Sequence, residues 1–103
     1  MTDIRDSYCR ALETRLATLD AQIADLERAE TAERVAMPGH PPSPEVAGLK
    51  TRRDEVSRHL ARCQFAEQDD WPAAHAAAEE SWRTVTHAFE RALTRFRGGA
   101  GGA

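Results

Sequence analysis

Hydrophobic residues recur along the first third of the chain at intervals of three and four, with polar residues between them. The apolar positions are Ile4, Tyr8, Leu12, Leu16, Leu19, Ile23 and Leu26. On a helix this spacing forms one narrow apolar stripe, like the a and d positions of a coiled coil. The same rhythm continues through Glu30 and Glu33 to Met37, and it predicts a helix over about residues 3–37.

Four of the five prolines fall within residues 38–44, where the first stripe stops. Gly39 can take the positive φ that closes a helix. Ser43 can cap a following helix, and Pro44 suits its first position, where a backbone N–H is not needed. We therefore predict a turn over residues 38–43 that joins two antiparallel helices.

The second predicted helix covers about residues 44–68 and carries a stripe with the same spacing. Its positions are Val46, Leu49, Arg53, Val56, Leu60, Cys63 and Glu67. If the chain folds symmetrically about the turn, the numbers of facing residues add up to 82 or 83, and Arg53 faces Glu30. Because polar residues within a seam commonly fix its register, Glu30 and Arg53 are the predicted register pair.

A third amphipathic segment follows a short polar turn and is predicted to be helical over about residues 72–97. Its seam consists of Trp71, His75, Ala78, Trp82, Val85, Phe89, either Ala92 or Leu93, and Phe96. A short turn favours a helix that runs back along the hairpin, which brings Trp71 near Tyr8. The predicted fold is all-α: an antiparallel helical hairpin plus a third amphipathic helix, forming one up-down-up three-helix bundle over residues 1–97. A flexible Gly/Ala tail is expected at 98–103.

Composition narrows the function classes. The chain has 103 residues, of which 30% are charged and only 6% aromatic, so a large globular core is excluded. The net charge of −3 does not indicate a nucleic-acid-binding protein, although Arg91, Arg95 and Arg97 could contact phosphates. No apolar run approaches the roughly 18 residues of a membrane span, and residues 1–6 do not open a secretory signal. We expect a cytoplasmic protein, and thirteen arginines against one lysine point to a bacterial source.

Candidate chemistry is sparse. His59 and Cys63 lie one helical turn apart and could begin a metal or redox site, but no second ligand pair accompanies them. The predicted register sets Cys9 about 15 Å from Cys63 along the helix axis, beyond the reach of a disulfide. No carboxylate pair lies in a cleft that could shift a pKa, so neither enzymatic activity nor a cofactor is expected.

The third helix is therefore the predicted functional surface, since it carries both tryptophans and two of the three phenylalanines. We expect a non-enzymatic helical interaction or structural module that self-associates or binds a protein partner, because aromatic anchors dominate such interfaces. The predicted partner-binding residues are Trp82, Val85, Phe89 and Phe96. Two alternatives stay open: a metal- or redox-responsive sensor built on the His–Cys pair, and a peripheral membrane-associated amphipathic protein. The third helix could also project from the hairpin and pair with a second chain.

Overall fold

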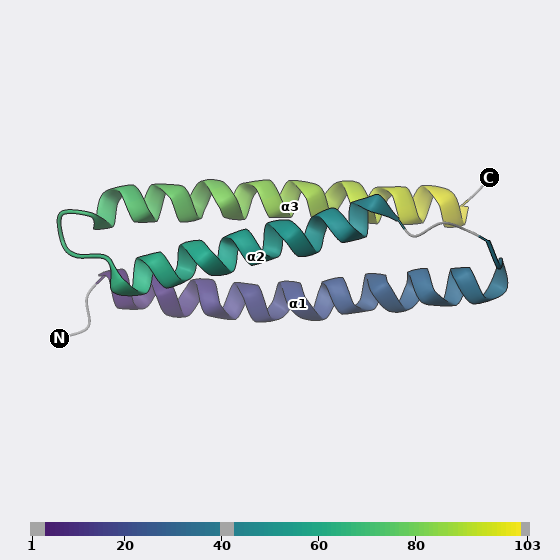
Figure 1. Ribbon diagram of the computed structural model, residues 1–103, viewed down its shortest axis with the longest axis horizontal. Helices are drawn as coiled ribbons and strands as arrows, with labels where there is room; N and C mark the ends of the chain where they lie inside the picture. Colours follow the sequence, from purple (N-terminus) through teal and green to yellow (C-terminus); the bar gives the residue numbers. More distant parts are fainter. Residues whose placement is uncertain (1–3, 40–42, 102–103) are drawn as a thin grey trace.

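The computed structural model describes the backbone of residues 4–39 and 43–101 and the side chains up to residue 95. Within these ranges the chain forms three helices and no β-strand: α1 (Ile4–Ala36), α2 (Pro44–Phe65) and α3 (Trp71–Gly101). They form an up-down-up bundle of 54 × 21 × 19 Å, in which α2 runs obliquely between α1 and α3 (Figure 1). The predicted all-α three-helix bundle is confirmed.

The turn between α1 and α2 follows the expected chemistry at both ends. α1 ends at Ala36, and Gly39 takes a φ of 96°, the positive value predicted for it. Ser43 occupies the N-cap position and Pro44 begins α2. The Ser43 hydroxyl, however, donates to the carboxylate of Glu45 at 2.9 Å and makes no capping bond to a backbone N–H. Residues 40–42 of the predicted turn lie outside the described part of the chain.

α2 ends at Phe65, three residues before the predicted limit of 68. The backbone leaves the helix at Ala66, where φ is −67° and ψ is 135°. The carbonyl of Ala66 accepts a hydrogen bond from the guanidinium of Arg5 on α1. Because Arg5 belongs to another helix, this hydrogen bond exists only once the helices have packed together. The sequence pattern of α2 could therefore not predict that the helix ends at Phe65.

α3 has Pro72 at its second position, where a missing N–H is tolerated, and it continues to Gly101. The helix thus extends four residues beyond the predicted end at Arg97, into the segment 98–103 that was predicted as a flexible tail. Glycine costs a helix about 1 kcal/mol relative to alanine but leaves its backbone hydrogen bonds possible. A helix that is already formed can therefore run on through such residues.

The core of the hairpin contains most of the apolar positions of the two predicted stripes and also Cys9, which neither stripe included. Its buried residues are Cys9, Leu12, Leu16, Leu19, Ile23 and Leu26 on α1, and Val46, Leu49, Val56, Leu60 and Cys63 on α2. Burial of each large aliphatic side chain contributes roughly 1.5–3 kcal/mol. The spacing of apolar residues therefore identified correctly which face of each helix is buried.

The two stripes meet in a register that lies about one heptad from the predicted one. In the described part of the chain, hydrogen bonds connect α1 to the segment 43–65 at four residue pairs: Glu30 with Ser43, Glu27 with Lys50, Asp20 with Arg53, and Glu13 with Gln64. The residue numbers in these pairs add up to 73–77 instead of 82 or 83. A slip of seven residues moves a helix by about 10 Å and brings an equivalent part of the seam to the interface.

The predicted register pair of Glu30 and Arg53 is consequently wrong. Arg53 forms a bidentate ion pair with Asp20, with Nε–Oδ1 and Nη2–Oδ2 distances of 2.6 and 2.8 Å. The hydrogen bond with Asp20 raises the pKa of Arg53. Glu30 accepts a hydrogen bond from the backbone N–H of Ser43 at 2.7 Å, so it attaches the end of the loop to α1.

A double-mutant cycle should detect this register. Asp20→Asn and Arg53→Gln should couple by about 0.5–1 kcal/mol, because solvent screens a pair at the surface. The two side chains are 43% and 32% exposed. Urea unfolding of the wild type, the two single variants and the double variant measures the coupling. Glu30→Gln combined with Arg53→Gln should show none, and coupling in that second cycle would restore the predicted register.

α3 packs against α2 through small side chains. Its buried positions are Ala74, Ala78, Val85, Ala88 and Ala92. Trp71, Trp82 and Phe89, which the predicted seam also included, are only partly buried at the margin of this line. α3 is therefore rotated relative to the prediction, and alanines let its axis approach α2 closely.

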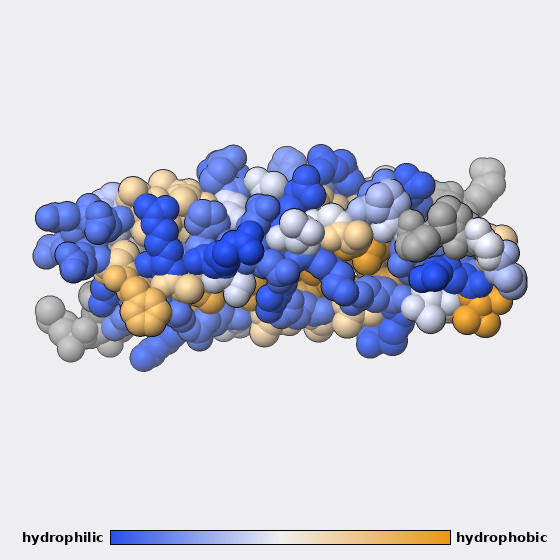
Figure 2. Space-filling model, in the orientation of Figure 1, coloured by the Kyte–Doolittle hydropathy of each residue, from blue (hydrophilic) through white to orange (hydrophobic). Residues whose placement is uncertain are grey.

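The large hydrophobic side chains that are exposed in the described part of the chain lie at helix ends. They are Ile4, Val35, Met37 and Phe65. The heptad slip leaves the last turns of α1 beyond the start of α2, which explains the 76% exposure of Val35 and the 51% exposure of Met37. Elsewhere on the face shown in Figure 2, polar side chains predominate and hydrophobic ones show in patches between them.

Candidate functional site

The junction of α1 with α3 is the least extensive of the three helix contacts, because both helices pack mainly on α2. The ring and charge contacts across this junction involve Tyr8 and Arg15 of α1. Their partners belong to the first half of α3. The aromatic side of α3 thus borders a helix that covers it only in part.

Three rings form a cluster where α1 and α3 begin. The Tyr8 ring meets Trp71 edge-on, with centroids 5.7 Å apart, and it meets His75 edge-on at 4.5 Å. Trp71 and His75 stack at 5.2 Å with an angle of 24° between their planes. Edge-to-face pairs contribute about 0.5–1.5 kcal/mol beyond the burial of their surface. The predicted proximity of Trp71 to Tyr8 is confirmed, and it follows from the parallel direction of α1 and α3.

A polar network extends from this cluster along the junction. The Tyr8 hydroxyl donates to Oε2 of Glu79 at 2.6 Å, and Nη1 of Arg15 lies 3.8 Å from the same oxygen. Burial, followed by the hydrogen bond to Glu79, raises the pKa of Tyr8 well above its usual value. The phenol therefore stays protonated and acts as a hydrogen-bond donor at neutral pH. No periodicity in the sequence indicates this contact, because it depends on the register between α1 and α3.

The structure separates the predicted partner-binding residues. Trp82 is partly buried, with the guanidinium carbon of Arg15 6.0 Å from its ring centre, at the limit of a cation–π contact. Phe89 is also partly buried. Val85 has no exposed surface, so it belongs to the core and is not available to a partner. The side chain of Phe96 lies outside the described part of the chain.

The predicted His59–Cys63 pair does not acquire further ligands. Cys63 is fully buried, and its thiol donates to the carbonyl of Ala74 on α3 at 3.4 Å. Burial raises the pKa of the Cys63 thiol, which opposes the thiolate form that binds metals. Among the described residues, no group of three His, Cys, Asp or Glu side chains is placed to hold a metal ion.

The two cysteines are closer in the fold than the predicted register implied. Both are buried thiols of the same core. In the observed register Cys63 lies opposite residues 10–14, within about a turn of Cys9, whereas the predicted register set it opposite Leu19. The negative charge that Cys9 can carry also contributes to the raised pKa of Cys63. The predicted separation of about 15 Å is therefore too large.

Two further findings bear on the function. Within the described ranges, no helix has an apolar stretch of the length that crossing a bilayer requires. Comparisons with protein-family models, with curated proteins and with solved structures found no match for this chain.

Proposed function

We propose that this protein is a non-enzymatic helical interaction module that self-associates through the side of α3 that borders α1. The observation that carries the proposal is a row of large apolar side chains on α3 that the bundle covers only in part. This aromatic edge consists of Trp71, Trp82, Phe89 and Leu93. Their separations of 11, 7 and 4 residues place them on one face of the helix.

The exposed area of the molecule supports association. Its accessible surface is 6852 Å² for a mass of 11.4 kDa. A compact monomer of this mass is expected to expose about 5,800 Å². The excess of roughly 1,000 Å² goes with the elongated shape of 54 × 21 × 19 Å, and it leaves room for the roughly 800 Å² that each partner contributes to a standard interface. A side-by-side dimer of such elongated bundles would remove surface of that size from water.

The charges beside the aromatic edge favour a second copy of this chain as the partner. A two-fold dimer places the same surface on both sides of the interface, so that surface must be complementary to itself. Arg15 and Glu79 lie beside Trp82 and provide one charge of each sign, with side chains 47% and 40% exposed. In a two-fold arrangement the cation of one copy can meet the carboxylate of the other.

Light scattering coupled to size-exclusion chromatography, over a series of protein concentrations, tests the proposal. We expect a mass near twice 11.4 kDa at high concentration. Trp82→Ala and Phe89→Ala should each weaken the dimer about 30-fold, the effect of losing a hot spot of about 2 kcal/mol. Circular dichroism should show that both variants remain helical.

Phe65→Ala is the matched control. Phe65 is 84% exposed at the end of α2, outside the aromatic edge, so this variant should associate like the wild type. A wild-type chain that stays monomeric at every concentration would contradict the proposal. Equal weakening by Phe65→Ala and Phe89→Ala would show that association is not specific to the aromatic edge.

A further inference from the structure

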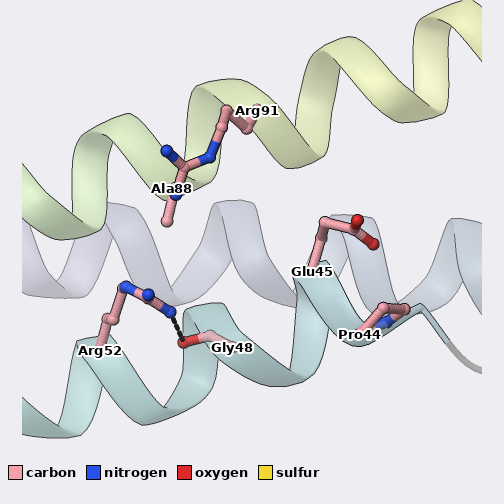
Figure 3. A pocket seen from close by; sticks show the side chains of 6 residues that line it. All are labelled: Pro44, Glu45, Gly48, Arg52, Ala88 and Arg91. Carbon is pink, nitrogen blue, oxygen red and sulfur yellow. Dashed lines mark hydrogen bonds between the residues drawn. The ribbon is translucent and has the colours of Figure 1, made fainter.

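A second surface feature lies between α2 and α3, near the start of α2. Here an open hollow of about 290 Å³ is lined by Pro44, Glu45, Gly48, Arg52, Ala88 and Arg91 (Figure 3). Gly48 and Ala88 are small residues from the two helices, so little side-chain volume fills the space between them. Arg52 extends from α2 and Arg91 from α3, and both side chains point toward the space between the two helices.

Neither of these two arginines forms an ion pair within the described part of the chain. Arg52 donates from Nη1 to the carbonyl of Gly48 at 3.4 Å, a long hydrogen bond to a neutral acceptor. In contrast, Arg53, Arg83 and Arg95 each lie within 3.0 Å of a carboxylate oxygen. Arg52 and Arg91 therefore bring two uncompensated positive charges to one hollow.

The single carboxylate that lines the hollow is already engaged. Glu45 accepts hydrogen bonds from Nη1 of Arg95 at 2.8 Å and from the hydroxyl of Ser43 at 2.9 Å. Its own backbone N–H, the Ser43 hydroxyl and Arg95 together lower the pKa of this carboxyl group, so it stays ionised. Because Arg95 balances the charge of Glu45, the hollow keeps the positive charge of Arg52 and Arg91.

We propose that Arg52 and Arg91 bind a small phosphorylated ligand, a phosphate monoester or a diphosphate, in this hollow. Guanidinium groups present planar pairs of N–H donors that match phosphate oxygens. α2 begins at the hollow with Pro44, and the positive end of its helix dipole favours an anion at the same place.

The surroundings of the hollow set the size of the ligand. Arg91 also lines two neighbouring hollows, and these include Glu80 and Glu90. The carboxylates interrupt the positive charge along α3, and the whole chain has a net charge of −3. A long polyanion such as nucleic acid requires a continuous series of phosphate contacts. A compact ligand with one or two phosphate groups fits the limited positive region.

Calorimetric titration of the full chain with pyrophosphate at low salt tests the proposal. We expect saturable binding of one pyrophosphate per chain. Arg52→Gln and Arg91→Gln should each weaken it about tenfold or more, as expected for the loss of a charge-assisted hydrogen bond. Arg58→Gln removes the same charge from an exposed position of α2 outside the hollow and should bind like the wild type.

Two results would overturn the inference. One is the absence of saturable binding to the wild type, and the other is equal weakening by all three variants, which would indicate a diffuse effect of net charge. Parallel titrations with inorganic phosphate and glycerol phosphate identify the preferred group among the bound ligands. Arg91 is exposed, so Arg91→Gln should fold normally and tests the proposal even if Arg52→Gln fails to fold. Light scattering of these variants should be unchanged, which separates this site from the aromatic edge.

Discussion

Ala78→Leu is expected to destabilise the bundle by about 1–3 kcal/mol, because three added heavy atoms must enter a contact that has no room for them. Ala78 has no exposed surface and lies in the line of alanines by which α3 packs on α2. Alanine and leucine are both good helix formers, so the loss reports packing and not helix propensity. Urea unfolding followed by circular dichroism measures the change.

Ala76→Leu serves as the control for Ala78→Leu. Ala76 lies on the exposed side of the same helix, so the identical substitution should change the stability by less than about 0.5 kcal/mol. If Ala78→Leu were instead as neutral as Ala76→Leu, the close packing of α3 on α2 at Ala78 would be contradicted. The comparison of the two variants therefore tests which face of α3 packs against α2.

The rotation of α3 could not be predicted from hydrophobicity. A hydrophobic pattern favours the largest apolar side chains for the core, whereas the distance between two packed helices decides whether large or small side chains fit. A seam drawn through Trp71, Trp82 and Phe89 has the strongest apolar character. The structure places Ala74 and Ala88 deeper, since a close approach of two helices requires small residues at the contact. Val85, which the predicted seam already included, is buried in this contact, whereas Trp82 and Phe89 lie at its margin and keep some exposed surface.

The register of the hairpin was ambiguous for a different reason. A heptad pattern identifies the buried face of each helix, but it is unchanged by a slip of seven residues. Gly39 and Pro44 behaved as predicted, and Ser43 occupies the N-cap position without a side-chain capping bond, but these turn residues did not fix the register. The sequence predicted Glu30 as the partner of Arg53, whereas the structure pairs Arg53 with Asp20. Glu30 instead accepts a hydrogen bond from the backbone of Ser43, and these contacts between helices distinguish the two registers.

The candidate sites depend on contacts between helices that are distant in sequence. Tyr8 and Glu79 are 71 residues apart, and their hydrogen bond requires the register of α1 with α3. The sequence indicated Arg91, with Arg95 and Arg97, as a possible phosphate contact, but it gave no reason to group Arg91 with Arg52. These two arginines line one hollow only because α2 and α3 pack side by side. The aromatic content of α3 led to the prediction of a functional surface there, whereas the sequence could not show which of the predicted residues keep exposed surface.

Leu49→Ala is expected to cost about 2–5 kcal/mol, the usual loss when a fully buried leucine is truncated and leaves a cavity. Leu49 has no exposed surface at the centre of the observed seam. Met37→Ala should cost less than about 1 kcal/mol, because Met37 is 51% exposed beyond the end of α1. In the predicted register Met37 faces Val46 inside the hairpin, so that register predicts a large loss of stability for Met37→Ala. Thermal and urea unfolding of the two variants therefore distinguish the registers: a loss at Met37 as large as that at Leu49 would contradict the observed one.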